Sequence, residues 1–189
     1  MKILITGHGG QLASEFYKNF EKTSFDFDFI SSKKLDITDL NSYNLSSLKK
    51  YNCIINCAAY TDVEKSETDK EAAIKVNSKG VRNLVKIAEK FNSKLIHFST
   101  DYVYNAQSFE ALNEDSKIDP INFYGKTKLS GEKTIFDSGC FHSIIRTSWV
   151  YSDVSKNFLL AILNKAKNDH VLNVVNDQFG CPTSSYEIA

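Results

Sequence analysis

Residues 2–13 read KILITGHGGQLA, in which an apolar run passes through glycines into a segment of helical period. We expect a strand over Lys2–Thr6 and a helix over about Gly10–Phe20, which together form a βα unit. Comparable apolar runs recur along the chain at Phe25–Ile30, Cys53–Asn56, Lys94–Ser99, Ser143–Thr147 and Val171–Val175. Longer segments of helical period alternate with them, most clearly one amphipathic helix over Asp69–Phe91. This alternation predicts an α/β fold with a doubly wound parallel sheet of the Rossmann type.

The glycines after the first strand predict a phosphate-binding turn. Gly7 permits a tight turn, Gly10 lets backbone amides approach a pyrophosphate, and the small Ala13 lets the helix pack closely on the strand. The helix N-terminus adds a positive field. The alternative is a glycine-rich turn without a ligand, but its place after the first strand favours dinucleotide binding.

Composition excludes several classes of protein. The chain has 189 residues, 42% of them hydrophobic, with 23 basic and 23 acidic side chains, which argues against both a disordered chain and a nucleic-acid binder. No apolar run reaches about 18 residues, so we expect a cytoplasmic protein without a membrane span or signal peptide. The four cysteines lack the CxxC spacing of a metal or redox site, and we interpret them as reduced thiols.

The second strand ends without the acidic residue that an NAD-selective site would place there. The sequence instead reads Ser31-Ser32-Lys33-Lys34, whose hydroxyls and cations suit the 2′-phosphate of NADPH. The alternative is a pair of ordinary solvated lysines. We therefore expect NADPH or NADH, with NADPH favoured.

Tyr124 and Lys128 lie four residues apart in a helical segment and so share one face. A phenol has a free pKa of about 10, and a nearby ammonium favours its ionised form. Tyr124 could then protonate a carbonyl oxygen as a hydride arrives at carbon, while Lys128 also binds the cofactor ribose. An isolated YxxxK match is more often two amphipathic surface residues.

Neighbouring residues support a site. Gly125 and Gly131 lie in this helix although each costs about 1 kcal/mol relative to alanine, which indicates a close approach by another group. Ser99 and Thr100 follow a strand at the edge where doubly wound sheets bind ligands, and Thr100 could bond the same carbonyl. Asn77 lies within the long helix, and we favour a backbone staple over a proton-relay role for it.

Several motifs in one order resemble the extended short-chain dehydrogenase/reductase superfamily, and more narrowly the dTDP-4-dehydrorhamnose reductase family. They are TGxxGQL (6–12), LDITD (35–39), NCAAYTDVEKSE (56–67), VN (76–77), STDYVY (99–104), NFYGKTKLSGE (122–132), RTSWVY (146–151) and VVNDQFGCPT (174–183). This resemblance covers essentially the whole chain. It implies reduction of the C4 ketone of dTDP-4-dehydro-6-deoxy-L-mannose to dTDP-L-rhamnose with NADPH or NADH.

The resemblance also implies roles for single residues. The catalytic positions are Thr100, Tyr124 and Lys128, and Thr100, Asp101 and Trp149 fall where the family meets the sugar. Cofactor contacts are implied for Tyr124, Lys128, Gly10, Gln11, Leu12, Asp36, Ile37, Ala59, Tyr60, Thr61 and Phe98, beside Gly7 of the turn. Some members bind Mg²⁺ through glutamates at a dimer interface, and Glu15 could match one of them, so a homodimer and Mg²⁺ are further expectations.

The chain differs from members of the family at its C-terminal end. We expect a dinucleotide-binding domain over 1–150 and an incomplete substrate-binding region over 151–189, because members continue well beyond Thr183. Ser184 and Glu187 have capping-box spacing, which predicts a helix that starts where the sequence stops, so we expect a longer natural polypeptide.

Other functions fit the same scaffold. A nucleotide-sugar dehydratase would carry a second acid after Asp101, where this chain has Tyr102, so elimination fits less well than reduction. The family also resembles the regulatory β subunit of methionine adenosyltransferase, which makes a non-catalytic dinucleotide-binding protein or an inactive remnant a second alternative.

Overall fold

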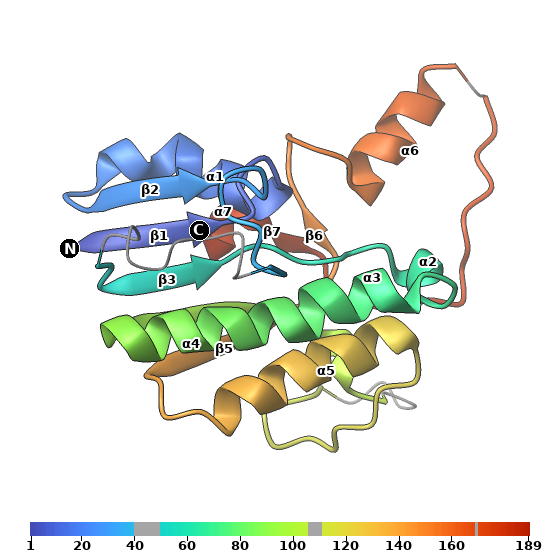
Figure 1. Cartoon of the computed structure of the whole chain (residues 1–189). Helices are drawn as coiled ribbons and strands as arrows, with labels where there is room; N and C mark the ends of the chain where they lie inside the picture. The colour runs from blue at the N-terminus through green and yellow to red at the C-terminus, as the bar shows by residue number, and fades with distance from the viewer. Residues whose placement is uncertain (40–49, 106–110, 169) are drawn as a thin grey trace.

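A parallel sheet organises the chain (Figure 1). The computed structural model describes residues 1–39, 50–105, 111–168 and 170–189. Within these ranges five strands pair in the order β2-β1-β3-β4-β5, all parallel. Their bounds are β1 Lys2–Thr6, β2 Asp26–Ile30, β3 Cys53–Asn56, β4 Lys94–Thr100 and β5 His142–Thr147. The doubly wound parallel sheet predicted from the sequence is therefore confirmed.

Helices cover both faces of the sheet (Figure 1). Successive side chains of a strand point to opposite faces, so Leu4 packs with the helices α4 (Val81–Phe91) and α5 (Phe123–Phe136). Ile3 and Ile5 pack on the other face, where Ala13 of α1 (Gln11–Asn19) closes the core. Both faces are apolar, which explains why the strands read as continuous hydrophobic runs. A 3₁₀ turn (Phe20–Lys22) and the short α2 (Val63–Ser66) complete this half of the chain.

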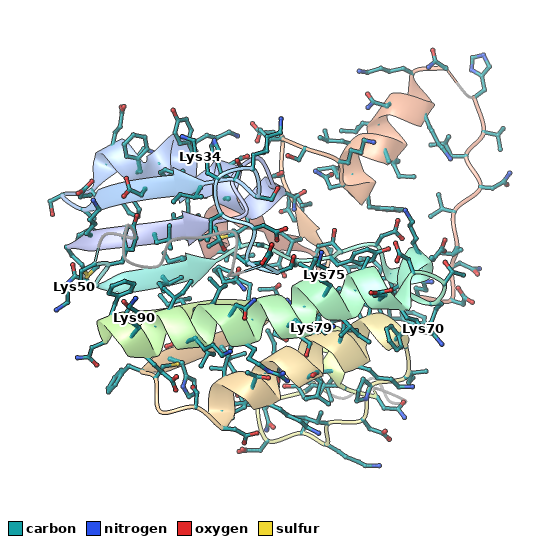
Figure 2. All side chains as sticks on the ribbon, viewed as in Figure 1. Lys34, Lys50, Lys70, Lys75, Lys79 and Lys90 are labelled. Carbon is teal, nitrogen blue, oxygen red and sulfur yellow. The ribbon has the colours of Figure 1, made fainter. Side chains whose placement is uncertain are left out.

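The predicted long helix is present, with an irregularity that periodicity did not indicate. It comprises α3 (Lys70–Ile74), a π-helical turn at Lys75–Gly80 and α4 without interruption. Its buried side faces the sheet, whereas lysines 70, 75, 79 and 90 point outward along it (Figure 2). The π turn contains Asn77, and such turns frequently occur at functional sites.

The segment after β5 differs from expectation. Val171–Val175 was predicted to be a strand, and this prediction is wrong, because the segment has no regular structure and Val171 is 78% exposed. An apolar run forms a strand only beside a partner, and the sheet within the described ranges ends at β5. A short parallel pair forms instead between β6 (Val150–Tyr151) and β7 (Thr183–Ser184).

Two helices belong to this last part of the chain. The helix α6 (Phe158–Ala166) projects away from the sheet (Figure 1), whereas α7 (Ser185–Ile188) returns to it, where Ile188 packs beside Ala13. The predicted helix start is thus confirmed, although the Ser184 side chain makes no capping bond. In the described ranges no helix combines the length and apolar character needed to cross a bilayer.

The position of α5 is fixed by two kinds of contact. Glu132 is fully buried and accepts two hydrogen bonds from Arg146 of β5, at 3.0 and 2.7 Å. A Cβ built on Gly131 would lie 2.4 Å from the carbonyl oxygen of Asn77, and one on Gly125 would lie 2.2 Å from that of Tyr102. The close approach predicted from these glycines is therefore confirmed, and protein backbone makes it.

Gly131→Ala is expected to lower the free energy of unfolding by about 1–3 kcal/mol, because the new methyl group forces α5 away from the π turn. This loss outweighs the gain of about 1 kcal/mol that alanine brings to a helix. Urea denaturation measures it. Gly139→Ala is the matched control, since a Cβ there meets nothing within 4 Å. Equal stability of the two variants would contradict the packing described here.

Candidate functional site

The turn between β1 and α1 forms a cradle of backbone groups. Gly7 has φ +75°, and a Cβ there would lie 2.7 Å from the backbone nitrogen of Ala58, so both the conformation and the space require glycine. Gly10 occupies the N-cap position of α1, and no side chain caps this helix end. The first N–H groups of α1 are thus available to an anionic ligand, as in dinucleotide-binding turns.

Gln11 and Leu12 follow the cradle and use their side chains for packing. The Gln11 Nε2 donates to the carbonyl oxygen of Val150 at 2.9 Å, which ties α1 to β6. Leu12 packs against the core cluster on the α1 face. Their side chains are thus used in packing, and it is their backbone N–H groups that could bind a phosphate.

The loop after β3 is fixed by one buried amide. The Asn77 Oδ1 accepts from the Tyr60 backbone N–H at 2.9 Å, and its Nδ2 donates to the Tyr60 carbonyl oxygen at 3.0 Å and to the Thr127 Oγ1 at 3.1 Å. The predicted staple role of Asn77 is thus confirmed. Ala59 and Thr61 flank the clamped residue, so the whole predicted cofactor-contacting triplet is held at the end of β3.

Asp36 and Ile37 lie on a separate segment that follows β2. The Asp36 carboxylate accepts from the backbone N–H of Thr38 at 2.9 Å and from its hydroxyl at 2.7 Å, and these bonds lower its pKa. The Ile37 side chain is buried in the core beside Gly80. The residues Ser31–Lys34 form the turn just after β2, where Lys34 is exposed (Figure 2).

Lys128 is buried in the core of the site. The residue is only 2% exposed, and its Nζ donates to the carbonyl oxygen of Phe98 at 2.6 Å. That carbonyl lies one residue past the last β3–β4 pair, Asn56 with His97. Burial lowers the pKa of Lys128 to about 8, and the carboxylate of Glu132 opposes this shift.

Tyr124 lies beside Thr100, which follows from the position of α5 next to the end of β4. Burial raises the pKa of Tyr124 to about 12, a hydrogen bond with Thr100 opposes this shift, and the carboxylate of Asp101 adds to it. The expectation that Lys128 makes the phenol more acidic is therefore wrong for this structure. The ammonium bonds the Phe98 carbonyl, and the cost of a buried phenolate dominates.

Thr100 and Asp101 form a polar turn at the end of β4. The Thr100 Oγ1 donates to the Asp101 Oδ1 at 3.1 Å and accepts from the backbone N–H of Tyr102 at 3.2 Å, which caps a 3₁₀ turn at Asp101–Val103. Burial raises the pKa of Asp101, whereas hydrogen bonds from Thr100 and Ser148 lower it. The sequence prediction of hydroxyls at this sheet edge agrees with the structure.

A cavity of about 230 Å³ opens next to this turn. It is lined by Asp101, Tyr102, Trp149, Gln178 and Phe179. Trp149 has φ +45°, a conformation that is rare for a bulky residue and frequently marks a functional position. The Tyr102 ring meets the Tyr124 ring edge-on at 5.9 Å, so the cavity lies beside the phenol.

The arrangement combines three chemical capacities. The N-terminus of α1 can hold a phosphate, a protonated phenol and a hydroxyl lie side by side, and a buried amine stands one turn along the same helix. A phenol kept neutral by burial can donate a proton to a developing oxyanion. Together these groups are suited to the reduction of a carbonyl beside a bound dinucleotide.

Comparison with known proteins is consistent with this site. A family model described as the RmlD substrate binding domain matches residues 1–189. The chain belongs to this family. The dTDP-4-dehydrorhamnose reductase of Aggregatibacter actinomycetemcomitans is 37% identical over 195 residues, which cover 100% of this chain and 65% of the relative.

Solved structures of proteins named dTDP-4-dehydrorhamnose reductase also match this chain. A crystal structure of a dTDP-4-dehydrorhamnose reductase from Clostridium acetobutylicum matches with a TM-score of 0.91 and 36% identity, over 100% of this chain and 67% of that one. The Bacillus anthracis enzyme in complex with NADP matches with a TM-score of 0.94 and 31% identity, over 99% and 67%. The RmlD-family chain described here therefore spans about two thirds of the length of these relatives.

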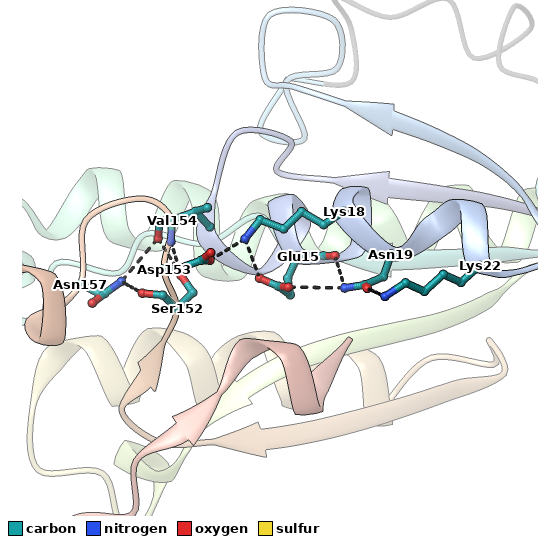
Figure 3. A network of polar contacts seen from close by, with 8 residues as sticks. All are labelled: Glu15, Lys18, Asn19, Lys22, Ser152, Asp153, Val154 and Asn157. Carbon is teal, nitrogen blue, oxygen red and sulfur yellow. Dashed lines mark hydrogen bonds and ion pairs between the residues drawn. The ribbon is translucent and has the colours of Figure 1, made fainter.

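Glu15, the residue expected at a magnesium site, belongs to a polar network in this RmlD-family chain (Figure 3). It is 6% exposed and lies 3.6 Å from the Lys18 ammonium, which also pairs with Asp153 after β6. In the parts of the chain that the structure describes, no group of three His, Cys, Asp or Glu side chains is arranged to hold a metal ion. The network instead joins α1 to the segment after β6.

Several residues of the site were not predicted. Tyr102, Gln178 and Phe179 line the cavity, and the last two fall in the motif VVNDQFGCPT (174–183), which carried the family resemblance without a role for these residues. Glu132 and Arg146 were also missed, because a pair separated by 14 positions leaves no periodic signal. His97 was read only as part of a strand, although it is fully buried.

The buried amine predicts a pH dependence of stability. The pKa of Lys128 falls from 10.5 to about 8 on folding, so between these values the unfolded chain binds more protons and stability rises with pH. Below pH 8 both states are protonated and the effect is constant. Urea unfolding of the wild type and of Lys128→Met over pH 7 to 10.5, a window set by this shift, should give curves whose difference grows with pH. Parallel curves would refute the shift.

Proposed function

We propose that this chain reduces the C4 ketone of a nucleotide-linked deoxysugar with NADPH, the substrate being dTDP-4-dehydro-6-deoxy-L-mannose and the product dTDP-L-rhamnose. The observation that carries the proposal is the bond between Tyr124 and Thr100 at the end of β4, with Lys128 one turn along α5 held by the neighbouring Phe98 carbonyl. This end of β4 lies at the same sheet edge as the glycine turn after β1. The relatives named dTDP-4-dehydrorhamnose reductase support the substrate, and the NADP complex of one of them supports the cofactor.

The residues present fit a nicotinamide dinucleotide. The positive-φ turn at Gly7 and Gly9 and the uncapped start of α1 suit its diphosphate. The clamped loop at Tyr60 and the Lys128 amine suit the ribose on the nicotinamide side. When bound, the reduced cofactor supplies a hydride. The exposed turn Ser31–Lys34 favours NADPH over NADH, because its hydroxyls and cations suit a 2′-phosphate.

The chain's own residues manage the proton. Tyr124 holds it on the phenol oxygen, because a phenol is neutral at physiological pH and burial raises its pKa further, and delivers it to the ketone oxygen as that atom gains charge. Thr100 bonds both Tyr124 and Asp101 and so orients the phenol and the oxygen it faces. The Lys128 ammonium, one turn along the same helix and held by the Phe98 carbonyl, would bond the cofactor ribose and so place the nicotinamide near the phenol.

The substrate binds in the cavity at the end of β4. Asp101 offers a carboxylate to sugar hydroxyls, and Trp149 offers a flat apolar wall. Residues 151–189 would begin the substrate-binding region, and residues 1–150 form the dinucleotide-binding part. The proposal also includes a homodimer and a Mg²⁺ site at its interface. Glu15 is the residue that would contribute to that site. Elimination is less favoured because Tyr102 follows Asp101 where a dehydratase would carry a second acid. A purely regulatory role is less favoured because Thr100, Tyr124 and Lys128 are all present.

Tyr124→Phe is expected to lower NADPH-dependent reduction of dTDP-4-dehydro-6-deoxy-L-mannose by about 100-fold or more, because it removes only the acidic hydroxyl. NADPH affinity should change little. The measurements are NADPH consumption at 340 nm and cofactor fluorescence titration. Turnover equal to that of the wild type would exclude the acid role, and a wild-type chain that binds neither NADPH nor NADH would overturn the proposed function.

Lys128→Ala is expected to weaken NADPH binding and turnover together, because the amine serves both the ribose and the phenol. Lys126→Ala is the matched control, since that side chain lies on the exposed side of α5. Fluorescence titration gives the affinity of each variant. An unchanged affinity in Lys128→Ala would contradict the ribose contact.

A further inference from the structure

Three polar side chains cross the middle of the otherwise apolar sheet. Thr6, Asn56 and His97 occupy paired positions on β1, β3 and β4. Each is about 1% exposed. The Thr6 Oγ1 donates to the Asn56 Oδ1 at 2.7 Å, and the Asn56 Nδ2 lies 2.9 Å from the His97 Nδ1. Such a buried row persists only where its hydrogen bonds are satisfied.

The bonds of Asn56 determine the protonation of His97. The Asn56 Oδ1 accepts from Thr6 and from the Ala58 backbone N–H at 3.1 Å, so its Nδ2 is the group that faces the histidine. An amide nitrogen only donates, and the His97 Nδ1 must therefore accept. Burial lowers the pKa of His97 well below its usual value, and the charge of Lys128 adds to this shift. The imidazole is thus neutral with its proton on Nε2.

His97 lies on the face of β4 that α5 covers, since Leu95 of the same face packs in one core cluster with Ile135 of α5. Within the described ranges, neither the His97 Nε2 nor the Ser99 Oγ has a hydrogen-bond partner, and both atoms are fully buried. The two residues are two apart on β4, so their side chains share one face at a separation of roughly 7 Å. Phe98 lies between them and its carbonyl holds the Lys128 Nζ. Buried polar atoms that lack a protein partner are the groups to which buried waters typically bond.

We propose that His97 is a positioning residue for Lys128, and that its Nε2–H anchors a water that joins the Ser99 hydroxyl to the Lys128 amine. The inference rests on the proposed function, because it assigns His97 a part in holding the amine that this function uses. The water accepts from His97 and from the ammonium and donates to Ser99, so each of the three groups gains a partner.

The anchored water would support the charge on Lys128. The amine has one protein acceptor in the described structure, the Phe98 carbonyl, although an ammonium has three protons to donate. The carboxylate that acts on the amine is Glu132 of the same helix, itself paired with Arg146 of β5. The titratable phenol of Tyr124 lies one turn before it. A second acceptor favours the ammonium, and its loss lowers the pKa of the amine.

Two substitutions at His97 separate this role from simple packing. His97→Asn keeps an acceptor where Nδ1 lies, so the bond from Asn56 survives while the donor toward Lys128 is lost. His97→Gln places an amide N–H near the position of Nε2 and gives up the Nδ1 acceptor. A positioning role requires His97→Asn to be the damaging change, and a role limited to holding Asn56 requires the reverse.

The titration of Lys128 is the readout, followed by NMR of protein with ¹³C-labelled lysine side chains and assigned with Lys128→Met. We expect its midpoint to fall by about one unit in His97→Asn and to stay unchanged in His97→Gln. A larger fall in His97→Gln, equal shifts or no shift would overturn the proposal. The measurement needs neither cofactor nor turnover, so loss of NADPH binding in the wild type would count against the proposed function alone.

The wild-type protein supplies a second test that does not depend on variants that fold. Long-range ¹H–¹⁵N NMR of the His97 ring should show a neutral imidazole with the proton on Nε2 at a pH below the ordinary histidine pKa of 6.5, because burial lowers the pKa of this ring. A proton on Nδ1, or a cationic ring at that pH, would overturn the proposal.

Discussion

The buried amine of Lys128 is the constraint on which the rest of the site depends. An ammonium that leaves water must be compensated by acceptors nearby, and the Phe98 carbonyl fills this role because β4 continues past the point where β3 stops pairing. The helix that carries the amine must then approach β4 and the π turn closely. Gly125 and Gly131 permit that approach, and the buried Glu132–Arg146 pair holds it.

Burial of these side chains lowers the stability of the fold but also sets the environment of the phenol. In a solvated position Tyr124 would exchange its proton freely with water, whereas burial keeps the phenol neutral and surrounds it with fixed dipoles. Thr100 connects this phenol to Asp101 at the rim of the cavity, so the proton donor and the polar edge of the cavity belong to one hydrogen-bonded unit. A group so placed needs little reorganisation when an oxyanion develops beside it.

Local sequence patterns were sufficient for the sheet and for the main parts of the site. The strands at Lys2–Thr6 and Cys53–Asn56 could be predicted because apolar runs between turn residues suit a sheet that is covered on both faces. The strand expected at Val171–Val175 does not form, since a run of β-branched residues carries no information on whether a partner strand exists. The raised pKa of Tyr124 and the pairing of Glu132 with Arg146 depend on burial and long-range contact, which no periodicity encodes.

The pairing of β6 with β7 has an evolutionary consequence. Residues 152–182 leave and return at adjacent points, because Val150 pairs with Thr183 and Tyr151 with Ser184. The excursion between them, which includes α6, is therefore anchored at a single base, and α7 beyond it packs on α1. Such an excursion can be lengthened or exchanged without altering the sheet, so the part of the cavity lining that it supplies, Gln178 and Phe179, can change while the β1–α1 turn stays the same.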